Sequence, residues 1–144
     1  MGATRTPVVF VHGLWLHADS WKNWIELYRA AGYEPIAPSW PGIPATVGEA
    51  RAHPENIGGH GVNGVADHDA KIIRTLAAKP IVIGHSFGGL IAQNLLGRGL
   101  AAAAIAIDAA PIKGVLPLPF SSLCVAFVAL KNPANIKGCG VAVR

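Results

Sequence analysis

The sequence of 144 residues has little cysteine and little charge. Its two cysteines, Cys124 and Cys139, have no further ligand residues at metal-site spacing, so we expect free thiols and no metal ion. Only 14% of the residues are charged, and the twelve Lys and Arg residues are scattered along the chain. No basic run with interleaved aromatic residues is present, which argues against nucleic acid as a partner.

Signals for membranes and secretion are missing as well. The sequence does not begin with a basic segment followed by an apolar core, which is the pattern of a secretory signal peptide. The longest apolar stretches, residues 100–110 and 123–130, are too short to cross a bilayer. We therefore expect a cytoplasmic protein with no membrane partner.

Apolar residues are abundant and make up 51% of the chain, enough for one domain with a well-buried core. Short β-branched runs alternate with stretches of helical periodicity, which predicts an α/β fold with a parallel sheet. The polar cluster of Asp67, His68 and Asp69 is expected to face solvent on one of these helices. The expected strands are 8–12, 34–38, 81–84 and 103–108, and the expected helices are 20–31, 65–78 and 87–98.

The most informative motif is Gly84-His85-Ser86-Phe87-Gly88, which directly follows a short β-branched run. A strand, a glycine, a serine, a second glycine and a helix in this order are typical of a nucleophile elbow. Glycines are needed at both flanking positions because a side chain there would clash across the turn. The turn raises the Ser86 hydroxyl clear of the sheet, and His85 is expected to support it. A plain strand–loop–helix junction would not explain the glycine spacing.

At this motif the chain resembles the α/β-hydrolase family, and a second signal agrees. The apolar strand that begins the sequence ends in His12-Gly13-Leu14. The resemblance implies that the backbone N–H groups of Leu14 and Phe87 bind the oxyanion of a tetrahedral intermediate. It assigns His12 and Gly13 to the support of this loop. It also implies a partial α/β-hydrolase fold, with a mostly parallel sheet of about four strands and flanking helices.

The catalytic partners of Ser86 are harder to find. In the family the chain order is serine, acid, histidine, yet no histidine follows Ser86; the six lie at positions 12, 17, 53, 60, 68 and 85. Asp108 is the only acidic residue after the serine and closes an apolar strand, so it is the candidate acid. The alternative for Asp108 is a residue that caps the following loop.

The resemblance covers most of the chain but only the first half of a complete family member. We expect residues 1–114 to form the N-terminal part of an α/β-hydrolase domain. Residues 115–144 are expected to begin a lid region and to end in an atypical tail. The missing histidine and the unusual tail together predict a hydrolase that is truncated at its C-terminus.

The function that the resemblance implies is hydrolysis of a small-molecule ester or similar acyl compound. Ser86 attacks the carbonyl and forms an acyl-serine intermediate, and no metal or organic cofactor is needed. Lyase or perhydrolase chemistry would use the same elbow and stays open. Activity is expected to be impaired because no histidine follows Ser86. The alternative is a non-catalytic fragment that only binds a small molecule or a protein partner.

Two further expectations concern apolar surface. The strand 103–108 should lie at an edge of the sheet, where its apolar faces favour self-association. The four tryptophans are candidates for the wall of a substrate pocket, although core packing is the preferred reading for Trp21 and Trp24. The other two are Trp15 and Trp40.

Overall fold

The computed structural model describes residues 5–53, 60–112, 114, 115, 120, 124 and 127. The chain divides into two compact units, and the first combines Met1–Trp40 with Gly61–Ala110. This first unit holds the sheet and every candidate site residue. The second unit combines Pro41–His60 with Pro111–Arg144. Most of the predicted lid region and tail, with Cys139, lies outside the described residues, whereas Cys124 is an exposed free thiol.

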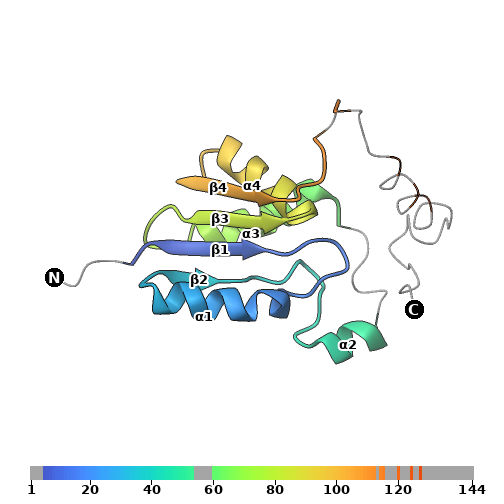
Figure 1. Ribbon diagram of the computed structural model, residues 1–144, viewed down its shortest axis with the longest axis horizontal. Helices are drawn as coiled ribbons and strands as arrows, with labels where there is room; N and C mark the ends of the chain where they lie inside the picture. The colour runs from blue at the N-terminus through green and yellow to red at the C-terminus, as the bar shows by residue number, and fades with distance from the viewer. Residues whose placement is uncertain are drawn as a thin grey trace. The chain divides into compact units, whose positions relative to one another are not determined.

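Four parallel strands form one sheet in the order β2-β1-β3-β4 (Figure 1). The central strand β1 is buried along its whole length, as expected for a parallel strand that is covered on both faces. The predicted α/β fold with a four-stranded parallel sheet is therefore confirmed. The strands are β1 Pro7–Val11, β2 Glu34–Ile36, β3 Ile81–His85 and β4 Ala103–Ile107.

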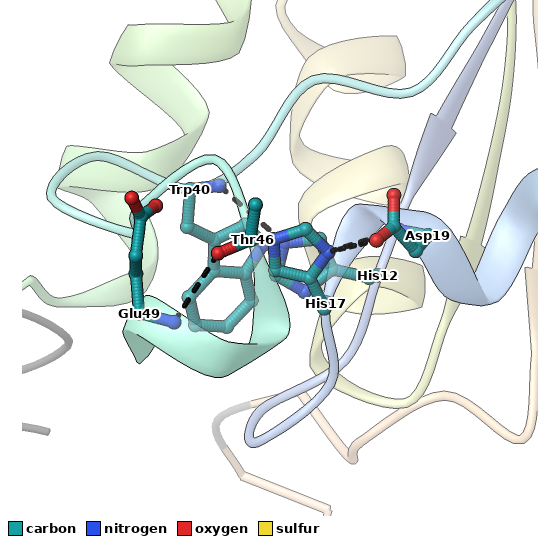
Figure 2. Close-up of polar contacts among 6 residues, drawn as sticks. All are labelled: His12, His17, Asp19, Trp40, Thr46 and Glu49. Atoms are coloured by element: carbon teal, nitrogen blue, oxygen red, sulfur yellow. Dashed lines mark hydrogen bonds and ion pairs between the residues drawn. The ribbon is translucent and has the colours of Figure 1, made fainter. Parts of the chain in front are cut away.

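Three helices of the first unit cover the sheet, with α1 on one face and α3 and α4 on the other (Figure 1). A short 3-10 helix, η1, leads into α1. In the second unit, Thr46 caps α2 by accepting a hydrogen bond from the Glu49 N–H at 3.2 Å (Figure 2). The helical elements are η1 Ala18–Trp21, α1 Lys22–Ala30, α2 Val47–Ala52, α3 Val62–Ile73 and α4 Phe87–Gly97. Among the described residues, no helix is long and apolar enough to cross a membrane.

The helix boundaries follow local hydrogen bonding. Gly32, with φ of 90°, ends α1 as the sequence predicted, because the Tyr33 N–H then reaches the Tyr28 carbonyl at 3.0 Å. Helix α3 was predicted to run to residue 78, but it ends at Ile73. There the Leu76 N–H bonds back to the Ile73 carbonyl, three residues earlier, and the tighter turn replaces the last α-helical turn.

An aromatic cluster holds α1 against the sheet. Phe10 of β1 meets Trp21 at a ring separation of 4.9 Å and Tyr28 edge-on at 5.2 Å. Trp24 joins from the rim of the cluster, 5.8 Å from Trp21. Such aromatic pairs each contribute about 0.5–1.5 kcal/mol beyond the area they bury. Trp21 is therefore a core residue, as preferred from the sequence, while Trp24 stays partly exposed.

The prediction that Asp69 faces solvent is wrong, because its side chain is only 1% exposed. At about 100° per residue, position 69 falls on the same helix face as Val65, Ala66 and Ile73, which are all buried. No described residue forms a hydrogen bond with either carboxylate oxygen of Asp69. This burial raises the pKa of Asp69 to about 7.

The neighbouring helix offers Asp69 no counter-charge. Helix α4, which packs against α3, has no ionisable side chain between Phe87 and Gly97. Arg98, directly after α4, is already paired with Asp67 at 2.9 Å. The Asp69 carboxyl is therefore most compatible with the fold when it is protonated and neutral.

We expect the stability of the protein to fall as the pH rises from about 4 to about 7, and to level off above that. Over this range the unfolded chain releases the Asp69 proton while the folded chain retains it. The full effect is on the order of 4 kcal/mol, so Asp69→Asn should raise the unfolding free energy at pH 8 far more than at pH 4. Urea unfolding at both pH values measures this difference. Asp67→Asn, in an exposed ion pair, is the control and should change stability little; equal effects of Asp69→Asn at both pH values would contradict the interpretation.

Strand β4 lies at the edge of the sheet, and among the described strands it pairs only with β3. It carries no charged residue and no proline, the features that usually protect an edge. The side chain of Ile105 is 47% exposed. This edge strand is therefore unprotected by its own sequence.

We expect the protein to self-associate through β4. Ile105→Lys should reduce association because a charge on an edge strand opposes pairing with a second strand. Light scattering over a range of protein concentrations measures the effect. Leu27→Lys, at a more exposed apolar position on α1, serves as the control. A wild-type protein that stays monomeric at every concentration would refute this expectation. An equal reduction of self-association by both variants would refute it as well.

Candidate functional site

Ser86 sits at the sharp turn between the end of β3 and the start of α4. Its backbone angles, φ 55° and ψ −121°, lie in a region that residues with a side chain rarely occupy. Such a conformation costs about 1–3 kcal/mol and persists only when the surrounding structure holds it in place. The Ser86 hydroxyl forms no hydrogen bond with any other described residue.

The backbone of Ser86 is held by hydrogen bonds from both sides. Its N–H donates to the Ile107 carbonyl at 2.9 Å, and its own carbonyl accepts from the Ala110 N–H at 3.1 Å. The same carbonyl accepts from the Gly89 N–H at 3.0 Å, inside the first turn of α4. The end of β4 therefore fixes the strained turn. This contact could not be predicted from the sequence, because nothing in a single chain marks which carbonyl will receive a distant N–H.

The two glycines beside Ser86 are required by close backbone contacts. A Cβ at Gly84 would lie 2.0 Å from the Gly88 carbonyl oxygen, across the turn as the sequence predicted. A Cβ at Gly88 would instead lie 2.1 Å from the Val11 carbonyl oxygen, at the end of the neighbouring strand β1. Gly88 therefore serves the packing of α4 on β1, whereas the sequence analysis assigned its clash to the turn itself.

The loop after β1 passes directly beside the serine. A Cβ at Gly13 would lie 3.0 Å from the Ser86 Cβ, so this glycine lets the loop approach the turn. The Leu16 N–H donates to the Gly13 carbonyl at 3.3 Å and closes a four-residue turn. The N–H groups of Leu14 and Phe87, the predicted oxyanion donors, make no hydrogen bond with any other described residue. Within the described part of the chain, both donors are therefore unpaired.

His12 links this loop to Trp40 (Figure 2). Its Nδ1 lies 2.9 Å from the Gly13 carbonyl oxygen and therefore carries the proton, while Nε2 accepts the Trp40 N–H at 3.4 Å. The ring stacks on the Trp40 indole at 5.2 Å. Burial lowers the pKa of His12, which keeps the ring neutral. Both ring nitrogens are thus engaged, and His12 is a positioning residue rather than a base.

Trp40 is not a pocket-wall residue. Its side chain is 7% exposed and packs on His12, so it joins the loop after β2 to the loop after β1. Sequence reasoning had no signal for this contact, because the two residues are far apart along the chain. Trp15, by contrast, is 68% exposed, which leaves it as the tryptophan most available to a ligand.

The remaining candidates are placed as follows. His85 ends β3, and its Nδ1 would lie 3.4 Å from a Cβ at Gly13. Asp108 directly follows Ile107, whose carbonyl binds the Ser86 N–H, and its side chain is exposed. His17 lies beyond the loop, where its Nδ1 is 3.2 Å from the Asp19 carboxylate (Figure 2). Among the described residues, no three His, Cys, Asp or Glu side chains gather as they would around a metal ion.

This geometry brings together a strained, unbonded serine hydroxyl and the loop that carries a free N–H group. A second free N–H belongs to Phe87, at the positive end of the α4 dipole. Unpaired N–H donors near a serine are what the stabilisation of a tetrahedral oxyanion requires. A base for the serine proton is not among the groups that contact Ser86 in the described part of the chain.

Comparison with known proteins supports the same description. The family described as the alpha/beta hydrolase family matches residues 8–138. No curated protein matches the sequence significantly. The family match covers all the predicted site residues in a single span.

Solved structures share the fold. An extracellular alpha/beta-hydrolase from a Paenibacillus species superposes with a TM-score of 0.66 at 22% identity, over 90% of this chain and 53% of that one. The monoacylglycerol lipase of Paleococcus ferrophilus gives 0.60 at 29% identity, over 85% and 45%. Potato (Solanum tuberosum) epoxide hydrolase I gives 0.61 at 21% identity, over 85% and 39%. The chain therefore spans about half, or less, of the length of these structures.

The close contacts around the turn predict that a single methyl group will disrupt it. Gly88→Ala should lower the unfolding free energy by about 1–3 kcal/mol or more, because the added Cβ meets backbone atoms that cannot move aside. Chemical denaturation measures the loss. Gly97→Ala, in the last turn of the same helix, has open space around it and should be neutral or stabilising. Equal stability of the two variants would show that α4 does not depend on this contact.

Proposed function

Because this chain belongs to the alpha/beta hydrolase family, we propose that it hydrolyses an ester or similar acyl substrate through an acyl-serine intermediate at Ser86. The observation that carries the proposal is the strained conformation of Ser86 at the end of β3, with its hydroxyl free of any described partner. Strain at a single serine in an otherwise regular junction is typical of a functional residue. The monoacylglycerol lipase among the structures of similar fold is an ester hydrolase by name, and its likeness supports the substrate class.

In the proposed reaction, the Ser86 oxygen forms a bond to the carbonyl carbon as its proton leaves. The electron pair of the carbonyl bond moves onto the oxygen, which receives hydrogen bonds from the N–H groups of Leu14 and Phe87. When the carbonyl bond re-forms, the alcohol departs and takes up a proton, leaving the acyl group on Ser86. Water then attacks in the same way, so that the acid is released and the hydroxyl of Ser86 is restored.

The rate of this reaction depends on the group that accepts the serine proton. His12 is unsuited to the task because both of its ring nitrogens are engaged and burial lowers its pKa. No histidine follows Ser86 in the sequence. Asp108, beside the turn, is the candidate acid that would orient such a histidine. For the 144-residue chain we therefore propose slow turnover, in which water takes the proton.

The second candidate function is binding without turnover. The engaged nitrogens of His12 favour it, because a serine without a base remains a weak nucleophile. In that case, the free N–H groups of Leu14 and Phe87 would hold an acyl compound or a carboxylate that is not converted. The two functions differ in one measurable respect, which is whether hydrolysis depends on Ser86.

We expect slow hydrolysis of p-nitrophenyl acetate that depends on Ser86, and Ser86→Ala should reduce it to the level that the N–H donors and substrate binding give without a nucleophile. When a triad member is missing, the oxyanion donors and substrate binding alone can leave roughly 10³–10⁴-fold acceleration over the reaction in water. Release of p-nitrophenolate, followed by its absorbance, measures the rate. Ser20→Ala, at an exposed serine before α1, is the matched control and should keep the full rate.

Two results would count against this proposal. Equal rates for wild type and Ser86→Ala would favour binding without turnover. Fast hydrolysis that is lost both in Ser86→Ala and in a single His→Ala variant would show that a histidine of this chain acts as the base, and the proposed transfer to water would be wrong.

A further inference from the structure

Three residues other than glycine in the described chain have a φ in the left-handed region: Trp15 at 63°, Ser86 at 55° and Asp108 at 43°. They follow β1, β3 and β4, which are neighbours in the sheet. All three therefore lie at the carboxyl edge of the strands, where open α/β sheets bind their ligands. Backbone strain in this protein is concentrated at the proposed site.

Two of these three conformations have a ready explanation. Ser86 is held by the hydrogen bonds from the end of β4. Asp108 has a short polar side chain, and aspartate tolerates the left-handed region better than most residues. Trp15 has neither advantage, because a bulky residue with a positive φ is a genuine outlier.

The position of Trp15 does not call for tryptophan on structural grounds. Trp15 is the third residue of the turn closed by the Leu16 N–H and the Gly13 carbonyl, a place that glycine or asparagine ordinarily fills when φ is positive. Its indole is 68% exposed, so core packing does not compensate for the strain. The next residue, Leu16, is also exposed, which makes the tip of this loop apolar.

The turn brings Trp15 within reach of the serine. Gly13 packs against the Ser86 Cβ, and two residues of extended chain span at most about 7 Å. Leu14, the proposed oxyanion donor, lies between them. The loop tip that carries this exposed indole therefore lies near an acyl compound bound at Ser86, and indoles contribute large apolar contact area.

From this combination we propose that Trp15 is a specificity residue that contacts an aromatic or similarly bulky apolar group of the substrate. The inference rests on the proposed function and extends it to a substrate class. It explains why a strained, solvent-exposed position is occupied by the largest apolar side chain, where glycine would fold at least as well.

The test compares two esters with the same leaving group, p-nitrophenyl acetate and p-nitrophenyl phenylacetate, and two acetates with different alcohols, ethyl and benzyl acetate. Trp15→Gly should lower kcat/KM for the bulky member of at least one pair by about tenfold relative to the small member. Trp15→Phe should restore most of that preference. Leu27→Ala, which removes an equally exposed apolar side chain from α1, should change neither ratio.

Stability provides an independent readout. Trp15→Gly should keep or raise the urea midpoint, because glycine adopts the positive φ without strain. A falling midpoint would show that Trp15 supports the fold instead, and unchanged preferences in both ester pairs would also overturn the inference.

A binding experiment separates this inference from the proposed function. If no ester shows Ser86-dependent hydrolysis, the proposed function fails, and saturation-transfer NMR with phenylacetate and acetate still tests Trp15. We expect saturation of the phenyl protons with the wild-type protein and its loss with Trp15→Gly. Equal saturation with both proteins would overturn the role of Trp15, whatever the outcome of the hydrolysis assay.

Discussion

The contact between the first turn of α4 and the end of β1 is the constraint on which the candidate site depends. Gly88 lies so close to the carbonyl groups of Val11 and His12 that no side chain fits between them. This approach fixes the start of α4 relative to the loop after β1. It therefore sets where the Phe87 N–H and the Leu14 N–H lie relative to Ser86. A helix that began about one ångström farther away would move Ser86 and Phe87 together away from the N–H group of Leu14.

A second set of contacts holds the other side of this loop. His12 links the Gly13 carbonyl to the Trp40 backbone and stacks on the Trp40 ring. The ring must be neutral to accept the Trp40 N–H, and burial keeps it so. The loops after β1 and β2 are thus tied together by one side chain. These contacts fit the supporting role that the resemblance implies for His12, and they leave neither ring nitrogen open to act as a base.

Much of the fold could be predicted from local sequence, and the reason is physical. Strand runs and Gly84 beside Ser86 reflect short-range requirements of backbone geometry, so the sheet and the turn were both predicted correctly, whereas the contact of Gly88 with β1 was not. The burial of Asp69 was missed because polar residues usually face solvent, and only the angular position of residue 69 on α3 places it inside. Two contacts join residues that are distant in the chain: the one between His12 and Trp40, and the hydrogen bond from the Ser86 N–H to the Ile107 carbonyl. Patterns along one sequence carry no record of such pairs, and the roles of the predicted site residues remain predictions for experiment.

The strand order has a consequence for how the site comes into being. The register that pairs β1 with β3 joins Val8 to Ile81, with β2 and the helices η1, α1, α2 and α3 between them in the chain. Pairing of this kind closes a long loop and is slow, because the entropy of closure must be lost before any contact is gained. Ser86 belongs to one partner and the loop of Leu14 to the other. A newly made chain therefore carries its serine and its N–H loop as separate, inactive pieces until the centre of the sheet has closed.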